Sequence, residues 1–239
     1  MVVIGKMKIA LVLALVVCAT AGVFAQGNNP SPEPPTAPAD SVPPVITFQQ
    51  VWDQAIPPYF SVGIDGAGKA TYHSSPQANN AGDPYDLKFN LSEETKTKVF
   101  DLAKQLNYFK GDFDYKKSRI AFTGTKTLRF QNGKEEHQTS YNWSDNLSMQ
   151  EITKIFQNMS ETIELGRSIA DKYRFDKLGV DAEMKKLEQA ARDDRTAELQ
   201  AISPILTKIA KDPSMMNITR RRADSLLAKI PKSAKISVQ

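Results

Sequence analysis

The apolar residues of this chain follow two different periods, and the change falls near residue 147. Before it, short β-prone runs lie between turn residues. The runs at 59–64 and 69–73 flank Asp65-Gly66-Ala67-Gly68, which predicts a hairpin. Residues 85–89 form a third candidate strand. This part of the chain is therefore expected to be rich in antiparallel strands.

A second hairpin is expected around Asn132-Gly133. This pair is favoured in two-residue type I′ turns, where both central residues have positive φ. A turn centred on the pair places Leu128 opposite His137 and Phe130 opposite Glu135.

Helical spacing appears once between the hairpins and then dominates the second half. Ser92 is the expected N-cap of a helix that extends to about Asn107. Ser148 and Glu151 fit a capping box at the start of a long helix that is expected to reach Phe175. Further helices are expected at 181–192, at 199–209 with a break at Ser203-Pro204, and at 218–230.

Strands followed by a run of helices predict an α+β fold, with a small antiparallel sheet and packed helices followed by a C-terminal helical segment. We expect the α+β domain to span 45–165 and the helical segment 166–231. Residues 232–239 are expected to form a flexible tail.

The N-terminus has the composition of a secretory signal. Lys6 and Lys8 precede an unbroken apolar run, and small or aliphatic residues follow it. This pattern predicts a signal peptide over residues 1–25 that is cleaved between Ala25 and Gln26. The chain is then periplasmic or secreted. Translation starts at Met1 or at Met7.

The alternative is an uncleaved N-terminal helix that anchors the chain in the inner membrane, because the apolar stretch approaches the length of a spanning helix. After cleavage we expect no stable membrane span. Cys18 is the single cysteine, so the mature chain has no disulfide. Val17 before it does not fit a lipoprotein signal. Residues 26–44 are rich in proline and are expected to form a disordered linker.

The formal net charge of +4 hides an uneven distribution. Acidic residues outnumber basic ones over 26–165, and basic residues are in excess over 166–239. The densest basic run is Arg220-Arg221-Arg222, a candidate contact for an anionic partner such as lipid or an envelope polymer. The alternative for this run is a solvated helix surface.

No motif assigns a reaction. Residues 63–70 match G-x-x-x-x-G-K but lack the final Ser or Thr and precede a strand, so we expect a hairpin and no nucleotide. His73 and His137 are the only histidines, and neither lies in a zinc-binding pattern. No catalytic, cofactor-binding or metal-binding residue is assigned. Four aromatic residues are candidates for a sugar platform, with strand packing as the alternative: Trp52, Tyr59, Tyr141 and Trp143.

Residues 59–141 resemble an uncharacterised domain family of exported bacterial proteins. The resembling pieces are Tyr59–Asp65, Gly66 to Tyr72, Leu91–Leu106, Tyr108-Phe109, and Thr127–Thr139 around its N-G-K turn. The resemblance implies export and a small α+β domain, and it carries no assigned activity.

We therefore expect an exported envelope or secreted protein whose role is binding rather than catalysis. Its expected partner is an envelope protein or an anionic polymer. The alternative is a hydrolase, acting on carbohydrate, whose site has no sequence motif.

Overall fold

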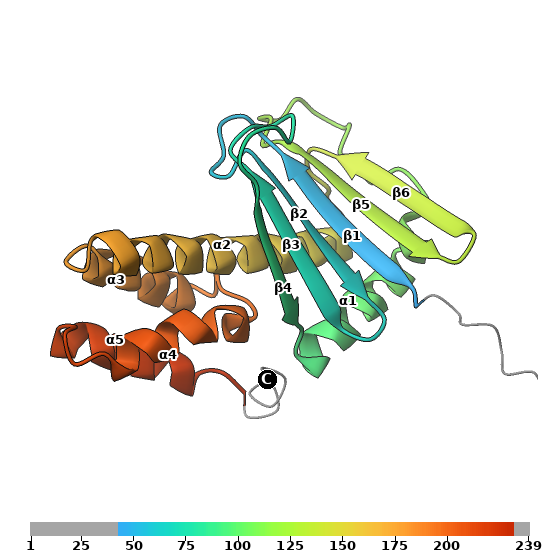
Figure 1. Ribbon diagram of the computed structural model, residues 1–239. Helices are drawn as coiled ribbons and strands as arrows, with labels where there is room; N and C mark the ends of the chain where they lie inside the picture. The colour runs from blue at the N-terminus through green and yellow to red at the C-terminus, as the bar shows by residue number, and fades with distance from the viewer. Residues whose placement is uncertain (1–42, 232–239) are drawn as a thin grey trace, which may run out of the picture. The chain divides into compact units, whose positions relative to one another are not determined.

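The computed structural model describes residues 43–231 and has an α+β fold, as the sequence predicts (Figure 1). Its six strands form one antiparallel sheet in the order β4-β3-β2-β1-β5-β6. The elements are β1 (Val45–Val51), β2 (Tyr59–Asp65), β3 (Lys69–Ser75), β4 (Tyr85–Asn90), α1 (Glu93–Gln105), the 3-10 turn η1 (Asn107–Phe109), β5 (Thr125–Asn132), β6 (Glu135–Tyr141), α2 (Leu147–Phe175), α3 (Val180–Arg192), the 3-10 turn η2 (Leu199–Ile202), α4 (Ser203–Lys211) and α5 (Asn217–Ala228).

Strand β1, which the sequence pattern does not predict, lies in the middle of the sheet and pairs with both β2 and β5. Ile46 and Phe48 point into the core and are fully buried. Gln50 continues the same face, and its side-chain oxygen accepts a hydrogen bond of 2.8 Å from Gln157 Nε2. The adjacent glutamines Gln49 and Gln50 interrupt the apolar alternation that would have identified β1.

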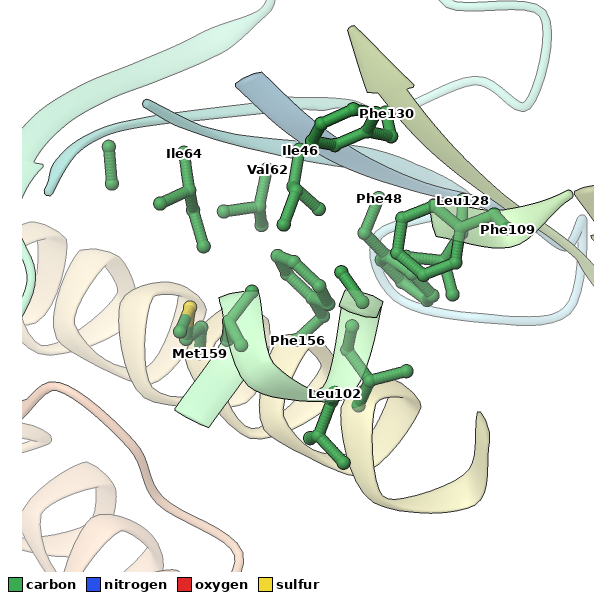
Figure 2. Close-up of a cluster of buried hydrophobic side chains, with 14 of the residues drawn as sticks. Ile46, Phe48, Val62, Ile64, Leu102, Phe109, Leu128, Phe130, Phe156 and Met159 are labelled. Atoms are coloured by element: carbon green, nitrogen blue, oxygen red, sulfur yellow. The ribbon is translucent and has the colours of Figure 1, made fainter. Parts of the chain in front are cut away.

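Helices α1 and α2 cover one face of the sheet. Their buried side chains pack with those of the strands in one cluster (Figure 2). Phe156 of α2 stacks on Phe48 of β1, with ring centroids 5.0 Å apart and an interplanar angle of 4°. Leu102 of α1 completes the same cluster. Alternate residues on the opposite face are exposed or half-buried, which is typical of an antiparallel sheet with one solvated face.

The β5–β6 hairpin forms, but its predicted register is wrong by two residues. Phe130 lies opposite His137 rather than Glu135. Asn132 and Glu135 are the last pair of the ladder, so Gly133 is the first turn residue, with φ of 59°. A type II′ turn needs positive φ only at its first central position and has glycine there, so Gly133 takes that position and Asn132 stays in the strand. The shift is even, so Phe130 keeps its buried face.

The two predicted N-caps have different outcomes. Ser92 caps α1, as expected, and its hydroxyl accepts a backbone N–H of the first turn. The capping box at Ser148 and Glu151 is wrong, because Asn146 caps α2 by accepting the backbone N–H of Met149 at 3.1 Å. Ser148 therefore lies inside the first turn.

Helix α2 belongs to two hydrophobic cores. Phe156 and Ile163 pack with the sheet and α1, whereas Ile169 packs with α3, α4 and α5. The helix is continuous through residues 165 and 166, which are the predicted boundary between the α+β domain and the helical segment. Both parts are thus built on one helix.

The carboxylate of Glu198 forms a second link between the two parts. Glu198 is only 8% exposed. Its Oε2 accepts the backbone N–H of Ser92 at 2.8 Å, and its Oε1 accepts the hydroxyl of Ser92 at 2.9 Å. The side chain of Gln200 also donates to it. Because Ser92 is the N-cap of α1, this negative charge lies at the positive end of the helix dipole.

We expect Glu198→Ala to lower the free energy of unfolding by about 2–3 kcal/mol, because hydrogen bonds to a buried charged group are lost. Urea unfolding followed by circular dichroism measures this value. Glu94→Ala, an exposed residue in the first turn of α1, should cost less than about 1 kcal/mol. Equal losses in the two variants would contradict a linking role for Glu198.

Several predictions fall outside the described residues. The signal peptide, the cleavage between Ala25 and Gln26, the linker up to residue 42 and the tail at 232–239 all stay predictions. Pro44, the last linker residue, is described: its carbonyl accepts the backbone N–H of Gly66 at 2.8 Å.

Candidate functional site

The three arginines predicted to contact an anionic partner do not share one exposed surface. Arg222 is 17% exposed at its side chain and pairs with Asp181 and Glu188, each at 3.3 Å. Arg220 is half-buried, and its Nε donates to a backbone carbonyl of α4. Arg221 is exposed. The triplet therefore contributes a single fully exposed arginine to the surface.

Both ring nitrogens of His73 are engaged on the open face of the sheet. Nδ1 lies 2.7 Å from Asp86 Oδ1, and Nε2 lies 2.7 Å from Asn80 Oδ1. The hydrogen bonds to Asn80 and then to Asp86 raise the pKa of His73 above its usual value, because two acceptor oxygens favour the protonated ring, in which both nitrogens donate. No ring nitrogen is left to deprotonate a serine, so His73 is not placed as the base of a hydrolase.

The hydrogen bonds of His73 predict that the free energy of unfolding depends on pH. The folded-state pKa of His73 is raised, so its contribution to stability is fully present below the unfolded pKa of about 6.5 and is lost as the pH rises through the folded value. The free energy of unfolding should therefore fall as the pH rises above about 6.5. His73→Gln should flatten this change and Asn80→Ala should reduce it, as measured by urea unfolding below and above this pH. An unchanged pH dependence in His73→Gln would contradict the assignment.

The four aromatic residues considered as a sugar platform do not form one exposed surface. Tyr141 is buried and hydrogen-bonded to a side chain of α2. Tyr59 packs edge-on against His73 with ring centroids 5.8 Å apart. Trp143 packs edge-on against Tyr115 at 5.0 Å.

The G-x-x-x-x-G-K segment is a hairpin turn between β2 and β3. Asp65 Oδ1 accepts the backbone N–H groups of Ala67 at 3.0 Å and Lys69 at 2.8 Å. A strand follows the turn, so this segment lacks the helix N-terminus of a phosphate loop. Within residues 43–231, no group of three or more His, Cys, Asp or Glu side chains is placed to hold a metal ion.

A cleft of about 1100 Å³ lies beside the middle of α2. Its walls come from α2, the loop that joins β1 to β2, and the start of α3. The polar residues that α2 contributes recur at helical spacing: Gln157, Ser160, Glu161, Glu164, Arg167, Ser168 and Asp171.

Glu164 is held in the cleft wall by hydroxyl groups from strand β3. The hydroxyl groups of Tyr72 and Ser74 both donate to Glu164 Oε1, at 2.8 Å and 2.6 Å. The Tyr72 hydroxyl also lies 3.0 Å from Ser160 Oγ. Burial, together with the charge of Glu164, raises the pKa of Tyr72 far above its usual value, so the phenol stays protonated and donates a hydrogen bond to Glu164. Two donors thus orient one carboxylate.

The cleft is lined by more negative than positive groups. Arg167 Nη1 lies 3.7 Å from Glu164 Oε2, and its guanidinium stacks over the ring of Tyr85 at 4.9 Å. Within the described chain, Asp53 and Asp171 form no ion pair closer than 4 Å. The lining carboxylates are Asp53, Glu161, Glu164, Asp171 and Glu183, and the lining cations are Arg167 and Lys186. The site therefore favours a positively charged ligand group.

A second hollow, of about 820 Å³, lies by the open face and edge strand β4. Gly63 forms part of its wall, where a Cβ atom would lie 3.1 Å from Thr71 Oγ1. Asp65 also lines this hollow, but its carboxylate accepts the backbone N–H groups of its own turn. We take the α2 cleft as the candidate site, because two hydroxyl donors orient its Glu164 carboxylate and its lining has more carboxylates than cations.

The residues of this cleft form no recognisable motif in the sequence. The available signal was the polar stripe from Gln157 to Asp171 on α2, which runs beside the apolar stripe. The hydroxyl donors Tyr72 and Ser74 lie about 90 residues earlier, and no local pattern connects them to Glu164.

No protein-family model matches the chain, and no curated protein matches it. Among the helices of residues 43–231, none combines the length and the apolar character needed to cross a membrane. The function is therefore inferred from the geometry of the cleft.

Proposed function

We propose that this chain is an exported, non-enzymatic binding protein whose α2 cleft receives a positively charged group of its partner. The observation that carries the proposal is the carboxylate of Glu164, held by Tyr72 and Ser74 in a cleft with excess negative charge. A pre-oriented acceptor binds a cation without first losing side-chain freedom.

The place of action follows from the N-terminal sequence. Export to the periplasm or the medium is supported by the residues before Gln26, which comprise a basic segment, an apolar run and small residues. The resemblance of residues 59–141 to a domain of exported bacterial proteins supports the same location. The partner is then an envelope protein that presents a lysine or arginine side chain.

Binding fits this cleft better than hydrolysis. A glycoside hydrolase needs one carboxyl group that carries a proton for the leaving group. At Glu164, Oε1 already accepts hydrogen bonds from two hydroxyl groups, and Oε2 faces Arg167. This carboxylate is therefore built to accept hydrogen bonds and to hold a positive charge.

Calorimetric titration with N-acetylated trilysine amide tests the proposal. We expect saturable binding to the wild-type chain and about tenfold weaker binding to Glu164→Gln, because a charge-assisted hydrogen bond is replaced by a neutral one. The glutamine keeps an oxygen that can accept from Tyr72 and Ser74, so the fold should be retained. An N-acetylated triglutamate peptide should not bind.

Glu135→Gln is the matched control, since Glu135 lies on β6 outside the cleft. Equal affinity in wild type and Glu164→Gln, or no saturation with trilysine, would overturn the proposal. Release of reducing sugar from polysaccharide by wild type but not by Glu164→Gln would favour the hydrolase instead.

A further inference from the structure

Four large apolar side chains are exposed at one end of the helical segment. Phe175 and Leu178, in the region that joins α2 to α3, are 75% and 83% exposed. Met216 and Ile218, where α4 turns into α5, are 44% and 50% exposed. Figure 1 shows both turns at the same end of these helices. We call these four residues the apolar tip.

Hydrogen bonds hold the two turns of the apolar tip together. Asp212, just after α4, accepts the hydroxyl of Tyr173 at 2.7 Å and the ammonium of Lys177 at 3.0 Å. Lys177 also donates to Ser214 Oγ at 2.7 Å. Hydrogen bonds from Ser214, and then from Tyr173 and Lys177, lower the pKa of Asp212 well below its usual range. The apolar tip is therefore a fixed surface.

The surroundings of the apolar tip are basic. The guanidinium of Arg174 lies 4.9 Å from the ring of Phe175. Arg221 is exposed and lies three residues after Ile218, on the same side of α5. The nearby anions Asp176 and Asp212 are already paired with lysines. Lys172 and Lys177 are the cations of these two pairs, and the neighbouring cations outside the pairs are Arg174, Lys211 and Arg221.

We infer that the apolar tip docks on an anionic lipid surface. Exposed apolar residues with a basic rim match the interfacial region of a membrane, where apolar side chains enter the headgroup layer and cations contact anionic lipids. Two helix turns with four apolar residues are a small area compared with the roughly 800 Å² per partner of a stable protein interface. The exposed Arg221 would then contact lipid, and no membrane-spanning helix is involved.

Cosedimentation with vesicles tests this inference. Both hydrophobic cores lie within 43–231, so the chain beginning at Gln26 keeps them. We expect it to bind vesicles of phosphatidylglycerol and phosphatidylcholine mixed in equal parts. Binding to pure phosphatidylcholine should be much weaker, and added salt should weaken binding to the mixed vesicles.

Leu178→Glu combined with Ile218→Glu should lower the partition coefficient at least about tenfold, because two apolar contacts with lipid are lost. Arg174→Gln combined with Arg221→Gln should also weaken binding to the mixed vesicles. Leu147→Glu is the matched control: Leu147 is 79% exposed at the opposite end of α2, and its substitution should leave partitioning unchanged.

Two results would overturn the inference. One is equal partitioning of Leu178→Glu/Ile218→Glu and Leu147→Glu. The other is a wild-type dimer in light scattering that Leu178→Glu/Ile218→Glu converts to a monomer, which would assign the apolar tip to a second copy of the chain. Circular dichroism of each variant confirms that the helices are retained.

Discussion

Gly166→Ala should lower the free energy of unfolding by about 2–4 kcal/mol, although alanine normally favours a helix by about 1 kcal/mol over glycine. Gly166 lies on α2 where η2 packs against it. A Cβ atom at this position would lie 2.2 Å from Cγ2 and 2.9 Å from Cβ of Ile202. Ile202 is buried, so its side chain cannot turn away into solvent. The two elements must move apart, and urea unfolding measures the loss.

A double-mutant cycle separates this overlap from other effects. Ile202→Ala alone removes buried apolar atoms and should cost about 2–5 kcal/mol. In the double variant the new methyl group enters the space left by the isoleucine, so the combined loss should be smaller than the sum by more than about 1 kcal/mol. Additive losses would show that Gly166 is not required by close contact with Ile202.

Phe156→Ala should cost about 3–5 kcal/mol, because a fully buried aromatic side chain is replaced by a cavity. Phe156 lies between the sheet and α1, and its ring stacks on Phe48 of the central strand (Figure 2). Its loss removes a contact that joins α2 to β1. Thermal and urea unfolding should both report the change.

Phe175→Ala is the matched control, because it makes the same substitution in the last residue of the same helix. Phe175 is exposed, and its removal in the absence of lipid should change the free energy of unfolding by no more than about 0.5 kcal/mol. Similar losses in the two variants would mean that the stack on Phe48 does not stabilise the sheet.

Turns and helices that depend on contacts between neighbouring residues could be predicted from the sequence. The turn after Asp65 forms because its carboxylate accepts two backbone N–H groups within four residues. Ser92 begins α1 by the same kind of short-range bond. The apolar stripe of α2 indicated correctly that the helix reaches Phe175. In each case the interacting groups are neighbours in sequence.

Strand β1 and the β5–β6 register show the limit of local patterns. β1 is central because β2 and β5 bond to it from both sides, although Gln49 and Gln50 interrupt its apolar pattern. Gln50 is tolerated there because Gln157 of α2 satisfies its side-chain oxygen. In the hairpin, the Asn132-Gly133 pair indicated correctly that a turn occurs. Pairing along the whole ladder decided that Gly133 lies in the turn and that Asn132 remains in the strand.

The sequence by itself determined the fold class, the hairpin turns and most of the helices of this protein. Only the tertiary structure decided the cleft, in which Tyr72 and Ser74 from β3 orient Glu164 of α2, and the contact of Glu198 with the start of α1. The physical reason is separation. Hydrogen bonds between groups about 90 or more residues apart leave no period in the chain, and they form only when packing brings two elements together.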